Sequence, residues 1–145
     1  MSRPLTPAIA VDIIIEMADH PARPIVLIER RYEPFGWAIP GGFVDMGERL
    51  EQAAIREAKE ETSLDVRLLI LLGNYSDPQR DPRGHTVSPV YVAEAIGKPR
   101  AMDDACNLSL FTPDKLPELV FDHARILEDY RRYRAQGLLT PLRMG

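Results

Sequence analysis

The sequence predicts an α/β fold in which helices pack on the faces of a mixed β-sheet. Two long stretches, 9–17 and 86–96, are rich in β-branched residues and have the composition of strands. Between them, residues 48–62 contain neither glycine nor proline and are rich in residues of high helix propensity. A second helical pattern lies near the C-terminus, and strands that alternate with helices are typical of layered α/β proteins.

The first half of the chain is expected to form four strands. Segments 9–17 and 24–29 have strand composition, and the residues 18–21 between them form a predicted turn. Two short strands are predicted next, at 37–40 and 43–45. Pro40-Gly41-Gly42 separates these two strands, and adjacent glycines allow a close backbone approach that side chains would prevent.

The first helix is predicted over about residues 49–62. At roughly 3.6 residues per turn, Glu57, Glu60 and Glu61 fall within an arc of about 100° on this helix. Lys59 and Gln52 are expected to point to water. Apolar side chains occupy the arc beside the glutamates and are expected to face the core: Leu50, Ala54, Ile55 and Ala58.

The second half of the chain is expected to complete the sheet. Long strands are predicted at 66–75 and 86–96, with a polar loop between them and a short strand at 107–111. Residues 121–133 form the second predicted helix, because apolar residues recur there at helical spacing: Ala124, Ile126, Leu127 and Tyr130.

Length and composition indicate one domain over residues 1–145. The chain has 45% hydrophobic and 28% charged residues, which is typical of globular proteins. Its net charge of −4 and the lack of a basic block argue against nucleic acid as a partner. An acidic protein that binds an anionic substrate must therefore concentrate arginines locally.

Cysteine usage and the N-terminal segment predict a cytoplasmic protein without disulfides or a membrane span. Cys106 is the single cysteine, so an intrachain disulfide is excluded, and its side chain is expected to be buried or half-buried. The apolar run near the N-terminus is broken by Asp12, is too short for a membrane span and lacks a cleavage-site pattern.

The glutamates of the first helix have two interpretations. Like charges four residues apart destabilise a helix by only about 0.2 to 0.5 kcal/mol per pair, which a solvated face tolerates. The helix would then be a charged surface helix, with Arg56 and Lys59 as partial counterions. Alternatively, the crowded carboxylates bind a cation.

The order of residues between Gly42 and Leu64 favours the cation. This 23-residue segment resembles the Nudix box, which requires six residues in one register. Two positions depart from the family pattern: Ser63 stands where glycine is usual, and Ala58 is smaller than the usual aliphatic residue. We expect Ser63 to change the helix C-cap and to leave the site intact. The six matching residues are Gly42, Glu48, Arg56, Glu57, Glu60 and Glu61.

The resemblance implies an α/β/α sandwich that hydrolyses a nucleoside diphosphate linked to another moiety, with Mg²⁺ or Mn²⁺ as cofactor. Carried over to this chain, Glu57, Glu60 and Glu61 would hold the metal together with the Gly41 carbonyl. Arg56 would pair with Glu48 and orient the acidic cluster. The general base would be either the residue at Glu57 or an acid from a loop outside the box. Hard cations and carboxylates suit this chemistry, because they neutralise the diphosphate and lower the pKa of bound water.

The loop of residues 76–85 also has two interpretations. In the structural one, Asp77 and Asp81 cap turns and pair with the loop's arginines. In the functional one, Arg80 or Arg83 presents a forked donor to a phosphate or to the terminal ribose of a substrate. The loop resembles that of the ADP-ribose pyrophosphatase branch of the Nudix enzymes, and Pro78 matches a proline of that branch. This resemblance favours the functional interpretation.

Further candidates lie in the loops around the predicted site. Phe35 is expected to stack on an adenine ring, whereas Trp37 is expected in the core. Asp103 or Asp104 would serve as a loop acid near the metals, because the segment around them also resembles the branch. His123, at the start of the second helix, is expected to be structural.

The sequence therefore predicts a hydrolase that splits ADP-ribose, or a close sugar nucleotide, into AMP and a sugar phosphate. One alternative is a nucleoside triphosphate pyrophosphohydrolase of the housecleaning type. A second is a non-catalytic sensor of ADP-ribose, but Nudix-like regulators of that kind carry an added DNA-binding domain. A small nucleotide is the expected partner, and neither nucleic acid nor membrane is expected. Relatives in this branch are often dimers, so a homodimer is one expected assembly.

Overall fold

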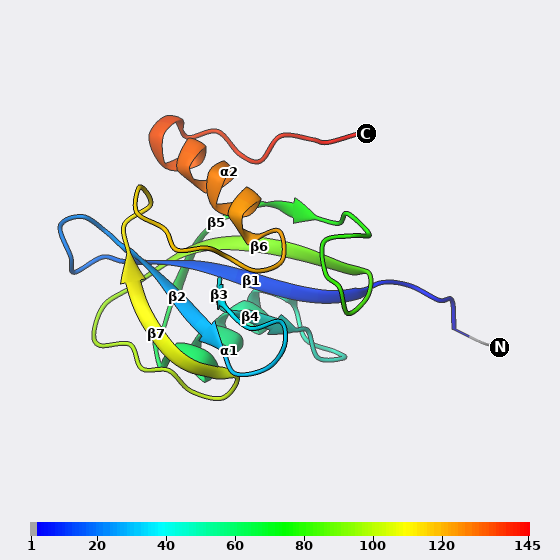
Figure 1. Ribbon diagram of the computed structural model, residues 1–145, viewed down its shortest axis with the longest axis horizontal. Coiled ribbons are helices and arrows are strands. Elements are labelled where there is room, and N and C mark those ends of the chain that lie inside the picture. The colour runs from blue at the N-terminus through cyan, green and yellow to red at the C-terminus, as the bar shows by residue number, and fades with distance from the viewer. Residues whose placement is uncertain (1–2) are drawn as a thin grey trace.

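A computed structural model describes residues 3–145 (Figure 1). Met1 and Ser2, the start of the segment expected to lack a signal peptide, lie outside the described residues. No helix in the described range is long and apolar enough to cross a membrane. The elements are β1 (Ala8–Met17), β2 (Ile25–Arg30), β3 (Trp37–Ala38), β4 (Gly41–Phe43), α1 (Leu50–Thr62), β5 (Arg67–Tyr75), β6 (Thr86–Ala95), β7 (Ala105–Phe111) and α2 (His123–Gln136).

The strands form one mixed sheet, as predicted. The order along the sheet is β3-β2-β1-β6-β5, while β4 also pairs with β1 and β7 with β2. β1 and β6 are parallel, and the other strand pairs in this sheet are antiparallel. β4 begins two residues earlier than predicted, because Gly41 and Gly42 themselves pair with β1, at Asp12 and Val11.

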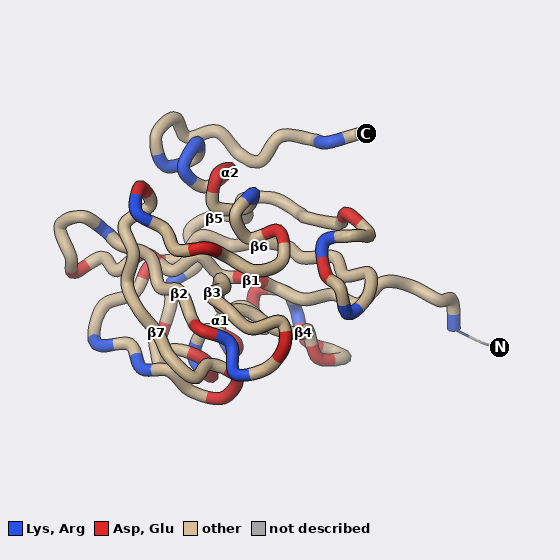
Figure 2. Tube along the Cα trace, viewed as in Figure 1, with Lys and Arg blue, Asp and Glu red and all other residues tan. Residues whose placement is uncertain are grey.

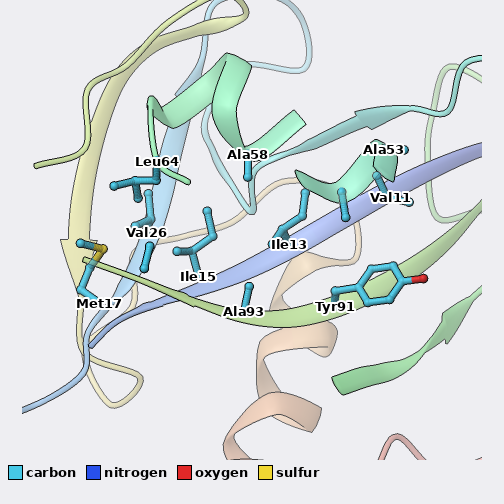
Figure 3. Packing of buried hydrophobic residues seen from close by; sticks show 12 residues of the cluster. Val11, Ile13, Ile15, Met17, Val26, Ala53, Ala58, Leu64, Tyr91 and Ala93 are labelled. Carbon is cyan, nitrogen blue, oxygen red and sulfur yellow. The ribbon is translucent and has the colours of Figure 1, made fainter. Parts of the chain in front are cut away.

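The two helices cover opposite faces of the sheet (Figure 1). Alternate residues of a strand point to opposite faces, so β1 contributes to two cores. Val11, Ile13 and Ile15 pack with the alanines of α1 (Figure 3), whereas Ile14 packs in the cluster that contains Ile126 of α2. The architecture is the α/β/α sandwich that the sequence predicted.

Small side chains bring α1 close to the sheet. Ala53, Ala54 and Ala58 are fully buried. Ile55 was expected on the buried side, but it is 44% exposed, so that prediction is wrong. The alanines allow the helix to lie so near β1 that the buried stripe is narrow, and a residue one position beyond Ala54 already faces solvent.

Cys106 is exposed, which corrects the expectation of a buried or half-buried thiol. It lies in β7, which pairs only with β2 among the described strands. Ala105 occupies the inward position and is buried, so the next side chain points out of the sheet. The Cys106 Sγ lies 3.4 Å from the carbonyl oxygen of Glu29.

Both helices end at a residue in the left-handed conformation. Ser63 ends α1 with φ of 65°, and its backbone N–H donates to the Lys59 carbonyl. Gly137 ends α2 in the same way, with φ of 72°. The changed C-cap expected at Ser63 is confirmed, since a residue with a Cβ occupies a position that favours glycine.

Ser63→Gly should stabilise the protein by about 0.5 to 1 kcal/mol, because glycine removes the steric cost of the left-handed conformation. Gly137→Ala is the matched control. A Cβ at Gly137 meets nothing within 4 Å, so only the backbone cost appears, and stability should fall by about 1 kcal/mol. Urea unfolding measures both. If Ser63→Gly destabilises the fold, the contact of the Ser63 hydroxyl with Met102 outweighs the backbone cost.

Candidate active site

The acidic side of α1 meets the glycine pair of β4. The backbone N–H of Gly41 donates to Glu61 Oε1 over 2.8 Å. A Cβ at Gly42 would lie 2.5 Å from the Glu57 carboxylate, and one at Gly41 would lie 2.2 Å from the Val11 carbonyl oxygen. The backbone contact excludes a side chain at Gly41, and a side chain at Gly42 would displace the Glu57 carboxylate. The glycines therefore allow strand and helix to approach until the carboxylates touch the backbone.

Arg56 links the other glutamates of the predicted box. Its Nε and Nη2 donate to both carboxylate oxygens of Glu48, at 2.7 and 2.9 Å, which confirms the predicted pair. Its Nη1 donates to Glu57 at 2.8 Å and to Glu60 at 3.2 Å. The Arg56 guanidinium lowers the pKa of Glu48 to about 2. One arginine thus orients three carboxylates.

The acidic cluster lacks a full complement of positive charge. Glu61 is 4% exposed, and this burial raises its pKa to about 8, with further contributions from the charges of Glu57, Asp104 and Asp12. Burial also raises the pKa of Glu57. The ionised forms of these carboxylates are poorly solvated and repel one another, so burial favours their protonated forms. A cation beside these groups would favour their ionised forms.

The donor atoms suit a hard divalent cation. Carboxylates of Glu57, Glu60 and Glu61, with the Gly41 carbonyl, are oxygen donors of the type that Mg²⁺ and Mn²⁺ prefer. In the described residues, however, no group of three or more His, Cys, Asp or Glu side chains converges to hold a metal. Arg56 takes the carboxylates of Glu57 and Glu60, so these two must turn from the guanidinium to bind a cation with Glu61.

Arg80 lines the pocket beside this cluster, but protein groups engage its guanidinium. Its side chain is only 4% exposed. Nε and Nη2 donate to the Asp122 carboxylate at 2.9 and 2.7 Å, and Nη1 donates to the hydroxyls of Thr86 and Ser88. These contacts favour the structural interpretation of Arg80. Its carboxylate partner is Asp122, just before α2, and not an aspartate of the loop 76–85.

Arg83 and Asp104 are more exposed than Arg80. Arg83 lines the pocket with its side chain 45% exposed, and its Nε and Nη2 donate to the Asp81 carboxylate. Asp104 is exposed, and its charge contributes to the raised pKa values of Glu57 and Glu61. The charge of Asp104 thus influences the cluster, but Asp104 is not among the residues that line the pocket.

The aromatic residues that line the pocket do not include the one expected from the sequence. Phe35 is 65% exposed and is not among the residues that line the pocket. Phe121 and Phe43 do line it, and so does Arg30 at the end of β2. Sequence reasoning did not select Phe121 or Arg30, because only the folded chain brings the end of β2 and the start of α2 together.

Two buried titratable groups form the floor of the pocket. Asp12 Oδ2 lies 3.9 Å from Arg80 Nη2 and 3.8 Å from His123 Nε2. Burial raises the pKa of Asp12 to about 7. The Nδ1 of His123 accepts the Ile39 backbone N–H, and burial lowers its pKa to about 3. This agrees with the structural role expected of His123. The sequence feature that could have identified Asp12 as a pocket residue is its position within the apolar segment of β1.

Fold and site together define an α/β/α sandwich protein with a carboxylate-bearing helix against a glycine strand. The chain belongs to the NUDIX family, because its residues 6–130 match the NUDIX domain.

Individual relatives agree with this assignment. The chain is 47% identical over 133 residues to the ADP-ribose pyrophosphatase of Methanocaldococcus jannaschii, covering 90% of this chain and 76% of that protein. A MutT/nudix family protein from Enterococcus faecalis superimposes with a TM-score of 0.78 at 28% identity, over 93% of this chain and 65% of that one. A bifunctional NMN adenylyltransferase/ADP ribose pyrophosphatase from Francisella tularensis, complexed with AMP and a Mn ion, superimposes with a TM-score of 0.67 at 26% identity. The match covers 85% of this chain and 40% of that one.

Glu61→Gln should flatten the pH dependence of stability in the metal-free protein. A carboxyl whose pKa rises on folding from 4.5 to about 8 stabilises the fold fully below pH 4.5, and this contribution is lost as pH rises through 8. Between pH 5 and 8 the unmodified protein should lose on the order of 2 to 4 kcal/mol relative to the variant. Urea unfolding in EDTA measures this. Glu51→Gln, at an exposed position of α1, is the control, and parallel profiles for the unmodified protein and Glu61→Gln would contradict the burial argument.

Proposed function

We propose that this protein is a divalent-metal-dependent hydrolase that splits ADP-ribose into AMP and ribose 5-phosphate. The proposal for the substrate rests on the 47% identity to an ADP-ribose pyrophosphatase over 90% of this chain. The proposal for the reaction class rests on the acidic cluster beside the glycine pair, which is short of positive charge. Both point to an anionic substrate bound through a cation.

Four groups would hold the metal: the carboxylates of Glu57, Glu60 and Glu61 and the carbonyl of Gly41. A divalent cation bound there would polarise a phosphoryl oxygen and activate a water molecule. The Gly41 N–H keeps Glu61 directed at β4. Arg56, itself fixed by both oxygens of Glu48, holds the neighbouring carboxylates in place from the other side.

Two carboxylates suit the role of general base. Glu57 belongs to the acidic cluster itself and is half-buried there. Asp104 comes from the loop directly before β7, and its charge contributes to the raised pKa values of Glu57 and Glu61. In either case, the carboxylate would take the proton of the attacking water as the water oxygen bonds to one phosphorus and the bridging P–O bond of the diphosphate breaks, which releases AMP and ribose 5-phosphate.

Purified protein with Mg²⁺ should convert ADP-ribose into AMP and ribose 5-phosphate in equal amounts, as followed by anion-exchange chromatography. Glu57→Gln and Glu60→Gln should each lower kcat by more than about 100-fold, because each removes a charged ligand. Glu51→Gln, on the exposed side of the same helix, should retain the activity.

The same assay separates the alternatives. Release of pyrophosphate from nucleoside triphosphates, without turnover of ADP-ribose, would identify a triphosphate pyrophosphohydrolase. Binding of ADP-ribose without product would identify a sensor. Unchanged activity in Glu57→Gln and Glu60→Gln would contradict the assignment of the metal ligands.

A further inference from the structure

The strand β1 buries two carboxylates, and protein groups fully engage one of them. Basic and acidic positions are interspersed along the chain (Figure 2), but β1 carries only two charged residues, Asp12 and Glu16. Arg23 donates to Oε1 of Glu16, and the Tyr130 hydroxyl donates to Oε2. Glu16 is therefore satisfied by the protein and is not among the residues that line the pocket, whereas Asp12 does line it.

The Asp12 carboxylate keeps acceptor capacity at the pocket floor. The Nη2 of Arg80 and the Nε2 of His123 lie 3.9 and 3.8 Å from its Oδ2, beyond the distance of a hydrogen bond. Burial raises the pKa of Asp12, while the charge of Arg80 and a hydrogen bond from Ser88 lower it. A carboxylate has about four acceptor sites, so the Ser88 hydroxyl does not saturate it.

His123 presents a donor to the same floor. Its Nδ1 accepts the backbone N–H of Ile39 over 3.0 Å, so this nitrogen carries no proton. The imidazole proton must then lie on Nε2, because the ring always carries at least one. The Nε2–H lies on the side of Asp12, and both residues line the pocket.

The protein holds this acceptor and donor in place through Arg80. The Nη1 of Arg80 donates to the Ser88 hydroxyl over 2.6 Å, which leaves the Ser88 proton for Asp12. Nε and Nη2 of Arg80 donate to the carboxylate of Asp122, the residue directly before His123. One buried guanidinium thus fixes the strand that carries Asp12 relative to the start of α2.

The spacing of the two atoms suits one small polar group. Because Asp12 Oδ2 and His123 Nε2 are 3.8 Å apart, a single ligand oxygen can lie within about 3 Å of both. A hydroxyl can accept from Nε2–H and donate to the carboxylate at once. A diphosphate oxygen carries no proton at neutral pH and would be repelled by Asp12. The two side chains are only 10% and 5% exposed, which favours a small group over the flat edge of a base.

We propose that Asp12 and His123 bind a ribose hydroxyl of the substrate and thereby select ribose over deoxyribose. This inference rests on the proposed function. A Cβ at Gly41 would lie 2.4 Å from Asp12 Oδ1, so the carboxylate lies beside the residue whose carbonyl would hold the metal. ADP-ribose carries a ribose on each side of its diphosphate. A hydroxyl bound at this floor would therefore belong to a ribose next to the bound diphosphate.

Hydrolysis of ADP-ribose analogues that each lack one ribose hydroxyl tests the proposal. With the unmodified protein, one deoxy analogue should have a kcat/KM about 10- to 100-fold below that of ADP-ribose, because a hydrogen bond to a buried charged group is lost. Asp12→Ala and His123→Asn should each lose most of this discrimination. His123→Asn keeps an acceptor for the Ile39 N–H, and circular dichroism confirms that each variant is folded.

Glu16→Gln is the matched control, because it neutralises the other buried carboxylate of β1, outside the pocket. It should lower stability and keep the discrimination. A purely structural role of Asp12 and His123 would lower kcat/KM for every analogue by the same factor, and this unchanged ratio would overturn the inference.

Two further outcomes would also decide the question. If Asp12→Ala instead changes the preference between ADP-ribose and its hypoxanthine analogue, the pair binds a base edge and the assignment to ribose is wrong. No turnover of ADP-ribose by the unmodified protein would overturn the proposed function, and the inference with it.

Discussion

The hydrogen bond from the Gly41 amide to Glu61 joins α1 to β4, and the geometry of the site depends on this contact. It requires glycine at position 41, since a Cβ there would collide with the backbone of β1. It also requires a helix that lies close to the sheet, which the buried alanines of α1 allow. A carboxylate is thereby buried near other carboxylates, and its pKa rises accordingly. The fold holds the glutamates in a state that a cation would stabilise.

The pocket is lined by groups of both charges and by a buried polar network. Glu61 and the two glycines of β4 line it together with Arg30, Arg83 and Phe121. Beneath them, Arg80 is saturated by Asp122 and two hydroxyls, so it fixes β6 to the start of α2. Arginines of one pocket thus have different tasks, and the number of hydrogen bonds that protein groups already make with each guanidinium distinguishes them.

Local sequence patterns were enough to predict the helices and the strands, because propensity and spacing act over short distances. The pairing of Arg56 with Glu48 was predicted from the resemblance to the Nudix box. The mixed sheet followed from their order. Features that depend on which distant segments meet could not be predicted. Ile55 is exposed because the alanines narrow the buried stripe, and Cys106 is exposed because Ala105 takes the inward position. The Arg80 partner, Asp122, is 42 residues away, and Phe121 entered the pocket where Phe35 was expected.

Anomalous diffraction from crystals soaked in Mn²⁺ tests the central claim most directly, since it locates the cation independently of catalysis. The account predicts a peak bound by the carboxylates of Glu57, Glu60 and Glu61 and the carbonyl of Gly41. Glu57 and Glu60 should have turned away from the Arg56 guanidinium, which should still hold Glu48. A peak elsewhere, or no peak with both carboxylates still on Arg56, would contradict a metal-binding role for the glutamate cluster.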